Sequence, residues 1–531
     1  MDPVSLILFA VVAILHAVGF LLPEKRRHEL GRVLRVAIGG GTVARPPPPP
    51  PTAAPPATTR LWRSPPRPWS LPILGNMVQL GLKPNPYECM TDMSKKLGAV
   101  YGLRLGGTEA LVVNDMASIR EVLITKGDHF DGRPNFLRYD ALFGGDRDNS
   151  LALCDWSKKQ ASRRNVARLF MHVRPGTDVF QMLNDSVQTE MTTLEQMLRD
   201  ARGTPVAFKP LIQNISCNIF SDYLCSKKFD INEPKFQKLV RNFDEIFWDI
   251  NQGYAMDFIG WLKVFRLGTI STLKRLSVDI RQFINDEIIN GHKDSIDYEN
   301  PRDFVDMLLK RMKTEEGGHE QISEVTALYE LEDFIGGHSA VGNIIMQTIT
   351  QIARNPEVMA KIQEELDSQV GDRQLSLDDR ASLPYTESTM YEALRVCSSP
   401  IVPHVASCDS NVGGYDVRKG TMVFINNYEL NMSPQLWSEP ERFDPARFVR
   451  GGKVVKPPHF LPFSTGKRSC MGSKMLTNVT FLTVATVLSK FDVLFPEDAA
   501  NSRMVAEHMR PGSLALPVDS FKLVFRERTV Q

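Results

Sequence analysis

Residues 462–472 read Pro-Phe-Ser-Thr-Gly-Lys-Arg-Ser-Cys-Met-Gly and carry the strongest signal in the chain. An apolar run with helical character follows directly. A cysteine thiolate can ligate haem iron, and the residues around this cysteine suit such a ligand. We therefore interpret Cys470 as the metal ligand of a haem, against the alternative of a buried structural cysteine. The other positions that support this interpretation are Phe463, Gly466, Arg468 and Gly472.

Each of these four residues has a physical role beside a thiolate ligand. Gly466 permits a turn with positive φ, and the guanidinium of Arg468 matches the geometry of a haem propionate. Phe463 can shield the sulfur from water, and Gly472 lets the next helix begin close to the porphyrin. Backbone N–H groups at the start of that helix favour the thiolate over the thiol.

This set of residues resembles the haem-binding signature of the cytochrome P450 family, and the resemblance extends from about Pro65 to the C-terminus. It implies a mainly α fold with a smaller β region, built as one large catalytic domain over residues 65–531. It also implies haem b, with NADPH supplying electrons through a separate NADPH–cytochrome P450 reductase, because the chain has no GxGxxG or flavin fingerprint. A small b-type cytochrome is a further candidate partner.

Composition excludes several other classes of protein. The 531-residue chain has a formal net charge of +1, which gives no general attraction to nucleic acid. Its seven cysteines are odd in number, and no pair has CxxC spacing. These features argue against a disulfide framework and a zinc site, and they fit a reducing compartment.

Residues 1–24 predict a transmembrane anchor. Pro3 to Leu22 is about 20 residues without Lys, Arg, Asp or Glu, which is long enough to cross a bilayer as a helix. Residues 25–27 are Lys-Arg-Arg, so the positive-inside rule places the following chain in the cytosol. A cleaved signal peptide or a mitochondrial presequence fits less well, because no positive charge precedes the apolar run.

Residues 25–64 form a basic and proline-rich linker, with six consecutive prolines at 46–51 that predict extended polyproline II. Together, the anchor and linker predict a single-pass membrane protein with a cytosolic catalytic domain, and the resemblance implies the endoplasmic reticulum membrane.

Trp156 is predicted to open a helix that is rich in basic residues. The family usually has Trp-x-x-x-Arg here, with both side chains on a propionate, so Trp156 is a candidate haem contact. This chain has Gln160 in place of that Arg, and Arg163 or Arg164 could substitute from one turn further along. The basic cluster is either a solvated face or a docking surface for an acidic electron donor.

Residues 243–267 are dense in aromatic and apolar side chains. The density is equally consistent with a core segment and with a surface that rests on the membrane above the substrate entry, as the resemblance implies.

The stretch from about Ser323 to Arg354 predicts one long helix. Its middle contains two glycines, each of which costs roughly 1 kcal/mol relative to Ala. The pair makes sense if the helix passes close to a ligand and widens a groove for dioxygen. The candidate catalytic residues are therefore Gly336, Gly337, His338 and Ser339.

The family motif here is Ala/Gly-Gly-x-Asp/Glu-Thr, and this chain has Ser339 at the acid position and Ala340 at the Thr position. The usual proton-delivering pair is thus missing. His338 could relay protons, but an orientation into a neighbouring helix is favoured. Residues 335–343 resemble the Spook-type branch of insect ecdysteroid-synthesising enzymes, and residues 144–150 resemble it as well.

Glu392 and Arg395 are three residues apart on a predicted helix that starts at about Tyr385. Glu-x-x-Arg alone is a weak signal. The frame Trp-x-x-Pro-x-x-Phe-x-Pro-x-Arg-Phe over residues 437–448 makes Arg447 the third partner. The resemblance gives the three residues a structural role behind the haem pocket.

His404 lies on a predicted strand after that helix. In the family a His or Arg at this place reaches the second propionate, whereas an ordinary strand histidine is the alternative.

The resemblance implies a haem-thiolate monooxygenase that oxidises a sterol, with 7-dehydrocholesterol or an oxidised derivative as the leading candidate in early ecdysteroid synthesis. Its expected partners are the reductase, membrane lipid and the sterol. The missing pair at 339 and 340 motivates one alternative, a haem-thiolate isomerase or dehydratase that acts on an oxidised lipid without dioxygen. Product formation without oxygen or reductase distinguishes the two.

Overall fold

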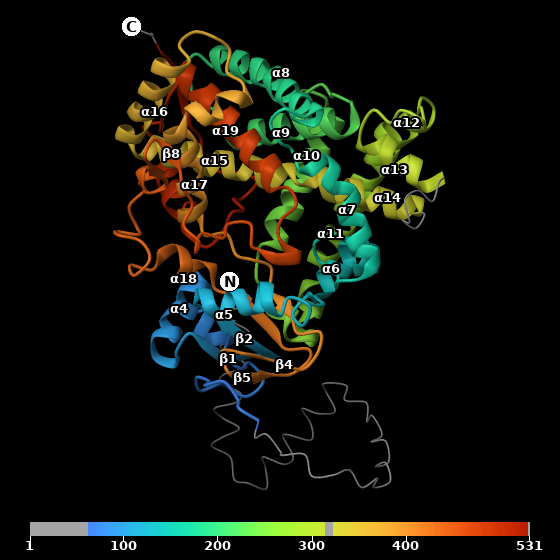
Figure 1. The fold of residues 1–531 in the computed structure, drawn as a ribbon. Coiled ribbons are helices and arrows are strands. Elements are labelled where there is room, and N and C mark those ends of the chain that lie inside the picture. The colour runs from blue at the N-terminus through green and yellow to red at the C-terminus, as the bar shows by residue number, and fades with distance from the viewer. Residues whose placement is uncertain (1–61, 314–321, 529–531) are drawn as a thin grey trace.

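The computed structural model describes residues 62–313 and 322–528 (Figure 1). The predicted anchor at 1–24 and almost all of the linker at 25–64 lie outside the described residues. Among the helices that are described, none has the length and apolarity needed to span a bilayer.

Helices dominate the fold. Those before the internal gap are α3 (Met77–Leu80), α4 (Pro86–Leu97), α5 (Met116–Arg120), α6 (Leu137–Leu142), α7 (Lys158–Met171), α8 (Asp178–Asp200), α9 (Phe208–Cys225), α10 (Pro234–Ile250), α11 (Leu267–Ile284), α12 (Asn290–Lys293) and α13 (Phe304–Lys313). Those after it are α14 (Glu324–Gly336), α15 (His338–Arg354), α16 (Pro356–Gln369), α17 (Pro384–Cys397), α18 (Asn427–Met432), α19 (Ser473–Lys490) and α20 (Ala499–His508).

The β region is small. Its largest sheet lies at one end of the molecule (Figure 1). That sheet has the strand order β1-β2-β6-β3, with β1 (Val100–Leu105), β2 (Thr108–Val113), β6 (Met422–Ile425) and β3 (His404–Val405). β1 and β2 form a hairpin around Gly106-Gly107, with pairing from Val100↔Val113 to Leu105↔Thr108. Three two-stranded sheets pair β4 (Ser410–Val412) with β5 (Tyr415–Val417), β7 (Val449–Arg450) with β8 (Lys453–Val454), and β9 (Phe491–Leu494) with β10 (Val524–Glu527).

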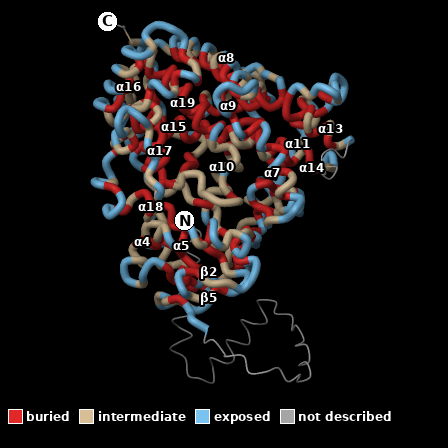
Figure 2. The backbone as a smooth tube through the Cα atoms, in the orientation of Figure 1, coloured by how far each residue is buried: buried red, intermediate tan, exposed pale blue. Residues whose placement is uncertain are grey.

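Three helices, α9, α15 and α19, form the centre of the molecule and are buried over most of their length (Figure 2). A helix that is apolar on nearly all sides can be stable only when other elements cover all of it. The helices α8, α10, α16 and α17 supply this cover. The mainly α architecture predicted from sequence is thus confirmed, with a smaller β region.

The long central helix differs from its prediction. It begins at Glu324, where the side chain of Ser323 accepts a hydrogen bond from the Thr326 N–H, but it divides at Gly337 into α14 and α15. The N–H of Gly337 bonds the carbonyl of Phe334 at 3.1 Å, and the N–H of Ala340 bonds that of Gly337 at 3.2 Å. These i→i+3 bonds tighten the turn.

A second boundary also differs. The basic helix α7 begins at Lys158 with Ser157 as its cap, so Trp156 precedes the helix instead of opening it. The Ser157 hydroxyl accepts from the N–H of Gln160 at 3.1 Å. This polar side chain can satisfy a free N–H of the first turn, and the indole cannot.

Candidate active site

The loop that carries Cys470 turns sharply before α19. Gly466 has φ +77°, and a Cβ at this position would lie 2.0 Å from the carbonyl oxygen of Leu123, so only glycine fits. The N–H of Cys470 bonds the carbonyl of Phe463 at 3.0 Å, which closes the turn. Gly472 caps α19, and a Cβ there would meet nothing within 4 Å.

The surroundings of the Cys470 thiol act on it in opposite directions. The residue is exposed along one side, yet burial by the neighbouring protein raises the pKa of its thiol. The N–H groups of Gly472 and Ser473 at the start of α19, and the charge of Arg164, lower that pKa. Donors aimed at the sulfur stabilise a thiolate, which is the form that ligates iron.

Cations gather beside this loop. Arg133 and Arg468 are buried, and Arg164 is partly buried. Burial, then the charge of Arg468, lowers the pKa of Arg133 to about 9 and that of Arg164 to about 10. Within the described residues, none of the three guanidiniums lies within ion-pair distance of a carboxylate. Buried charges of one sign require a partner of the other sign.

Arg468 illustrates this requirement. Its Nη2 donates to the carbonyls of Ala152 at 2.9 Å and Cys154 at 2.8 Å. Its Nη1 is buried and has no hydrogen-bond partner among the described residues. One arm of the fork is therefore held by the protein, and the other is free to bind an anion.

His404 is arranged in the same way on β3. Its Nδ1 donates to the carbonyl of Phe130 at 2.6 Å, and its buried Nε2 has no partner among the described residues. Burial, and then the charge of Arg133, hold the pKa of His404 well below its usual range. A carboxylate at Nε2 would favour the protonated ring, which then donates from both nitrogens.

Trp156 is half-buried above the same loop. The guanidinium of Arg468 lies 5.8 Å from the centre of its ring, and the ammonium of Lys467 lies 5.0 Å from it. Trp156 therefore contacts the loop through its aromatic face, and these contacts help to orient Arg468.

Arg163 does not take the place of the family arginine that Gln160 replaces. Gln160 is buried and donates to the carbonyl of Leu151. Arg163 forms an ion pair with Glu330 at 2.7 Å and donates to two carbonyls, so all of its charge is used inside the protein. Arg164 donates to the carbonyl of Ser469 at 2.6 Å, which leaves it as the candidate beside the cysteine loop.

Sequence reasoning missed Arg133. It lies in an irregular loop before α6, and its Nε donates to the carbonyl of Ala152 at 3.2 Å. No motif marks a single arginine in an irregular loop, so its place beside Arg468 could not be inferred from spacing.

The haem expected from the sequence fits these residues. A thiol with donors aimed at its sulfur could ligate the iron, and the two carboxylates of haem suit guanidiniums that have no carboxylate at ion-pair distance among the described residues. The unpartnered atoms Arg468 Nη1 and His404 Nε2 are suitable donors for them.

The central helix presents a different environment. His338 is buried, its Nδ1 donates to the carbonyl of Ile335 at 2.7 Å, and its ring stands perpendicular to that of Phe243 at 5.3 Å. Burial lowers its pKa to about 4, so it is neutral near pH 7. The favoured interpretation, in which His338 points into a neighbouring helix, agrees with this contact to α10.

The two glycines at the break also make helix packing possible. A Cβ on Gly336 would lie 3.0 Å from the ring of Phe243, and one on Gly337 would lie 3.2 Å from that of Phe220. The small residues thus admit aromatic rings from α10 and α9. A role in widening a groove for dioxygen stays a prediction.

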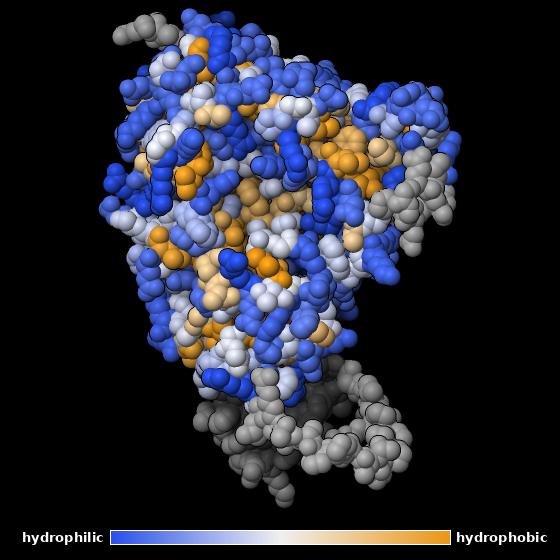
Figure 3. Space-filling view, viewed as in Figure 1, coloured by the Kyte–Doolittle hydropathy of each residue, from blue (hydrophilic) through white to orange (hydrophobic). Residues whose placement is uncertain are grey.

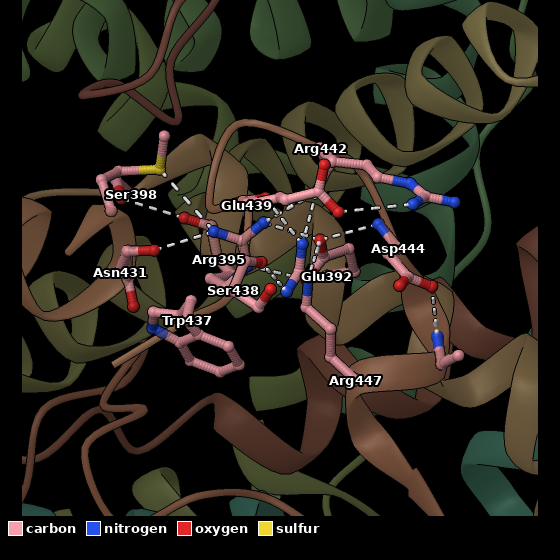
Figure 4. A network of polar contacts seen from close by, with 12 residues as sticks. Glu392, Arg395, Ser398, Asn431, Trp437, Ser438, Glu439, Arg442, Asp444 and Arg447 are labelled. Carbon is pink, nitrogen blue, oxygen red and sulfur yellow. Dashed lines mark hydrogen bonds and ion pairs between the residues drawn. The ribbon is translucent and has the colours of Figure 1, made fainter. Parts of the chain in front are cut away.

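Behind the pocket, Glu392 lies between two arginines (Figure 4). It accepts from Arg395 at 2.8 Å and 2.7 Å, from Arg447 at 3.3 Å, and from the N–H of Asp444 at 2.9 Å. Arg442 turns away and pairs with Glu439. The longer sequence frame, with Arg447 as third partner, therefore describes the structure.

One face of the molecule carries an apolar region. In the space-filling view, apolar side chains gather in the middle of this face, between the elements labelled α17 and α7 in Figure 1, with hydrophilic surface around them (Figure 3). A concave apolar region with a few convergent polar groups is typical of a small-molecule site.

Comparison with known proteins agrees with this picture. A family model described as Cytochrome P450 matches residues 65–525. Cytochrome P450 307a1 of Drosophila melanogaster is 41% identical over 87% of this chain and 88% of its own length. A steroid 17-alpha-hydroxylase/17,20 lyase of Rana dybowskii is 30% identical over 81% of this chain and 84% of its own. Cytochrome P450 18a1 of Drosophila melanogaster is 30% identical over 82% of each.

Proposed function

Because the chain belongs to the cytochrome P450 family, we propose that it is a sterol monooxygenase that acts at an early step of ecdysteroid hormone synthesis. The observation that carries the proposal is the thiol of Cys470, which lies at the start of α19 beside a cluster of cations. The substrate class rests on the similarity to Cytochrome P450 307a1 and to steroid hydroxylases, and on the likeness of residues 335–343 to the Spook-type branch. The leading candidate substrate is 7-dehydrocholesterol or an oxidised derivative.

As a member of this family, the chain is an oxidoreductase that uses haem b and receives electrons from NADPH through a reductase. When bound, haem supplies the activation of dioxygen and its insertion into a C–H bond. Cys470 would hold the iron, and Arg133, Arg468 and His404 would bind the propionates. Phe463, which is half-buried beside the loop, would keep water from the sulfur.

Electron delivery requires a docking surface for the reductase. Lys158, Lys159 and Arg168 on α7 are exposed, whereas Arg163 is buried in its ion pair. The exposed three therefore support the docking interpretation of the basic cluster, because uncompensated surface charge steers an acidic partner. A small b-type cytochrome would use the same surface.

We propose an endoplasmic reticulum location, with an anchor at 1–24, a linker at 25–64 and the catalytic domain at 65–531 on the cytosolic side. The segment between α10 and α11 supports contact with the membrane. Its η4 turn (Gly260–Arg266) exposes three apolar residues, while others nearby join a small core cluster. The exposed residues are Trp261, Val264 and Phe265, and the buried ones are Met256, Ile259 and Leu262.

The test is product analysis. The full-length protein in membranes with reductase, NADPH and 7-dehydrocholesterol should yield an oxidised sterol by mass spectrometry, with oxygen incorporated from labelled dioxygen. Omission of the reductase, or strict anaerobiosis, should abolish the product. Product that forms equally without oxygen or reductase would overturn the proposal and establish the isomerase or dehydratase. The comparisons do not favour that alternative, since the named steroid relatives are hydroxylases.

A further inference from the structure

The central helix lacks the acid that the family motif places at position 339, but a buried acid on a neighbouring helix is connected to the backbone of this position. Asp244 belongs to α10 and is only 3% exposed. The side chains that bond its carboxylate are all buried, so no surface group accounts for its position.

Three side chains hold Asp244. Its Oδ2 accepts from the ammonium of Lys209 at 2.5 Å. Its Oδ1 accepts from the amide of Gln213 at 3.0 Å and from the amide of Asn343 at 3.3 Å. These partners come from α9 and α15, so the carboxylate joins three helices at one point.

The same two amides connect Asp244 to position 339. The Nδ2 of Asn343 donates to the carbonyl of Ser339 at 2.8 Å, and the Nε2 of Gln213 donates to it at 3.3 Å. Each amide uses its two hydrogens, one for the carboxylate and one for the helix backbone. Asp244 is therefore linked to the backbone carbonyl of Ser339 through one amide side chain along each of two routes.

The network also reaches the chain after α20. The Oδ1 of Asn343 accepts from the N–H of Leu516 at 2.8 Å. Lys209 donates to the carbonyls of Leu516 at 2.8 Å and Pro517 at 3.0 Å. The ammonium thus uses its three donors on the carboxylate and on this segment.

Two buried polar atoms of the network have no partner among the described residues, Ser339 Oγ and Gln213 Oε1. Buried hydroxyl and carbonyl oxygens are normally satisfied by protein or by ordered water. Beside a carboxylate, they are suitable partners for water. Burial raises the pKa of Asp244, against the lowering effect of Lys209, so the site favours a group that can take up a proton.

We propose that Asp244, held by Lys209, supplies the oxygen site with the buried acid that position 339 of the central helix lacks. This inference rests on the proposed monooxygenase function. The reaction RH + O2 + 2 e− + 2 H+ → ROH + H2O takes both electrons from NADPH through the reductase, and both protons leave in the water formed. Asp244 is a positioning residue that acts through Ser339 Oγ and water, and it regains each proton from solvent.

The first test is Asp244→Asn, which keeps the shape and removes the acid. The holoprotein should retain its reduced carbon monoxide spectrum and its spectral response to sterol. Product formed per NADPH should fall at least about tenfold, because positioned proton transfer contributes at least that much, and hydrogen peroxide should rise to match. In the wild type, replacement of water by deuterium oxide should raise the yield of hydrogen peroxide.

The decisive variant is Asp244→Asn with Ser339→Asp, which returns an acid to the helix itself, next to Gln213. It should restore most of the coupling between NADPH use and product. A structural role for Asp244 predicts no restoration. Glu330→Gln is the matched control, since it removes another buried acid with an arginine partner and should leave product per NADPH unchanged.

Asp244→Asn strands a buried lysine and can fail to fold. Lys209→Met with Asp244→Asn removes both charges and avoids that strain, and it should show the same loss of coupling. Normal coupling in either folded variant overturns the inference. An absence of product in the wild type would instead contradict the proposed function. In that case the peroxide yields of the wild type and the variants still test the role of Asp244, and equal yields would overturn the inference.

Discussion

The cysteine loop and the central helix satisfy their buried polar groups in opposite ways. Near the loop, Arg468 and His404 each have a buried nitrogen without a hydrogen-bond partner in the part of the chain that the structure describes. At the break, Asp244 and Lys209 satisfy one another. The loop side is thus complete only with an external anion, whereas the helix side carries its counter-charges internally.

This difference separates what the family motif maintains from what this chain has rearranged. Every motif position is present in residues 463–472, and the local backbone depends on them, as Gly466 shows. At 339 and 340 the motif is absent, and neighbouring helices supply the polar groups instead. In our proposals, ligation therefore depends on local sequence, and proton supply depends on tertiary structure.

The comparison is tested most severely by Cys470→Ala. Loss of the sulfur should abolish monooxygenase activity, because no other side chain on the loop can supply a thiolate to the iron. The reduced protein under carbon monoxide should lose the long-wavelength absorption that is characteristic of a thiolate ligand. Cys408→Ala, at an exposed cysteine outside the site, is the control and should leave both unchanged. Retained turnover in the Cys470 variant would refute the assignment.

Glu392→Gln tests the scaffold behind the loop. The variant leaves Arg395 fully buried without its counter-charge, and breaking a buried ion pair typically costs about 3–5 kcal/mol. We expect the midpoint of urea unfolding and the haem content to fall together. Arg442→Ala removes only an exposed pair and should change stability by less than about 0.5 kcal/mol. Equal effects of the two variants would show that the Glu392 network has no special role.

The sequence predicted the parts of the site that depend on local spacing. The cysteine loop is one contiguous turn, and Glu392 and Arg395 lie on one helical face, so both could be identified from residue order. Arg133 and Asp244 could not, because an irregular loop and an ordinary amphipathic helix bring them to the site through tertiary packing. The division at Gly337 was missed because packing against Phe220 and Phe243, which sequence does not show, tightens the turn.

His338→Phe tests whether His338 is uncharged in the folded protein. The pKa of His338 is lowered from 6.5 to about 4 by burial, so the unfolded chain binds a proton more readily. The wild type should therefore lose stability as the pH falls from about 6.5 toward 4, by up to about 3 kcal/mol from this residue. The phenylalanine variant, which retains the ring contact with Phe243, should lack this part of the acid sensitivity in urea unfolding at several pH values.

His292 provides a control of opposite sign. Burial lowers its pKa, but the hydrogen bond that its Nε2 donates to Asp303, together with other partners, raises the pKa overall. Its contribution to stability is present at acid pH and is lost as the pH rises through the raised pKa. His292→Phe should therefore make the protein more sensitive to acid. The same pH dependence in both variants would contradict the assignment of a neutral His338.

Ala340→Thr should have the smallest effect. It restores the hydroxyl of the family motif at a half-buried position on α15, and threonine is tolerated in a helix. If protons arrive through the network of Asp244, the new hydroxyl is not needed, and product per NADPH should stay within about threefold of the wild type, or under about 1 kcal/mol. A large gain in coupling would show that the native site lacks an efficient donor, which would weaken the contrast between the two sides. A complete loss of product, with the carbon monoxide spectrum intact, would show that the pocket has no room for the added atoms.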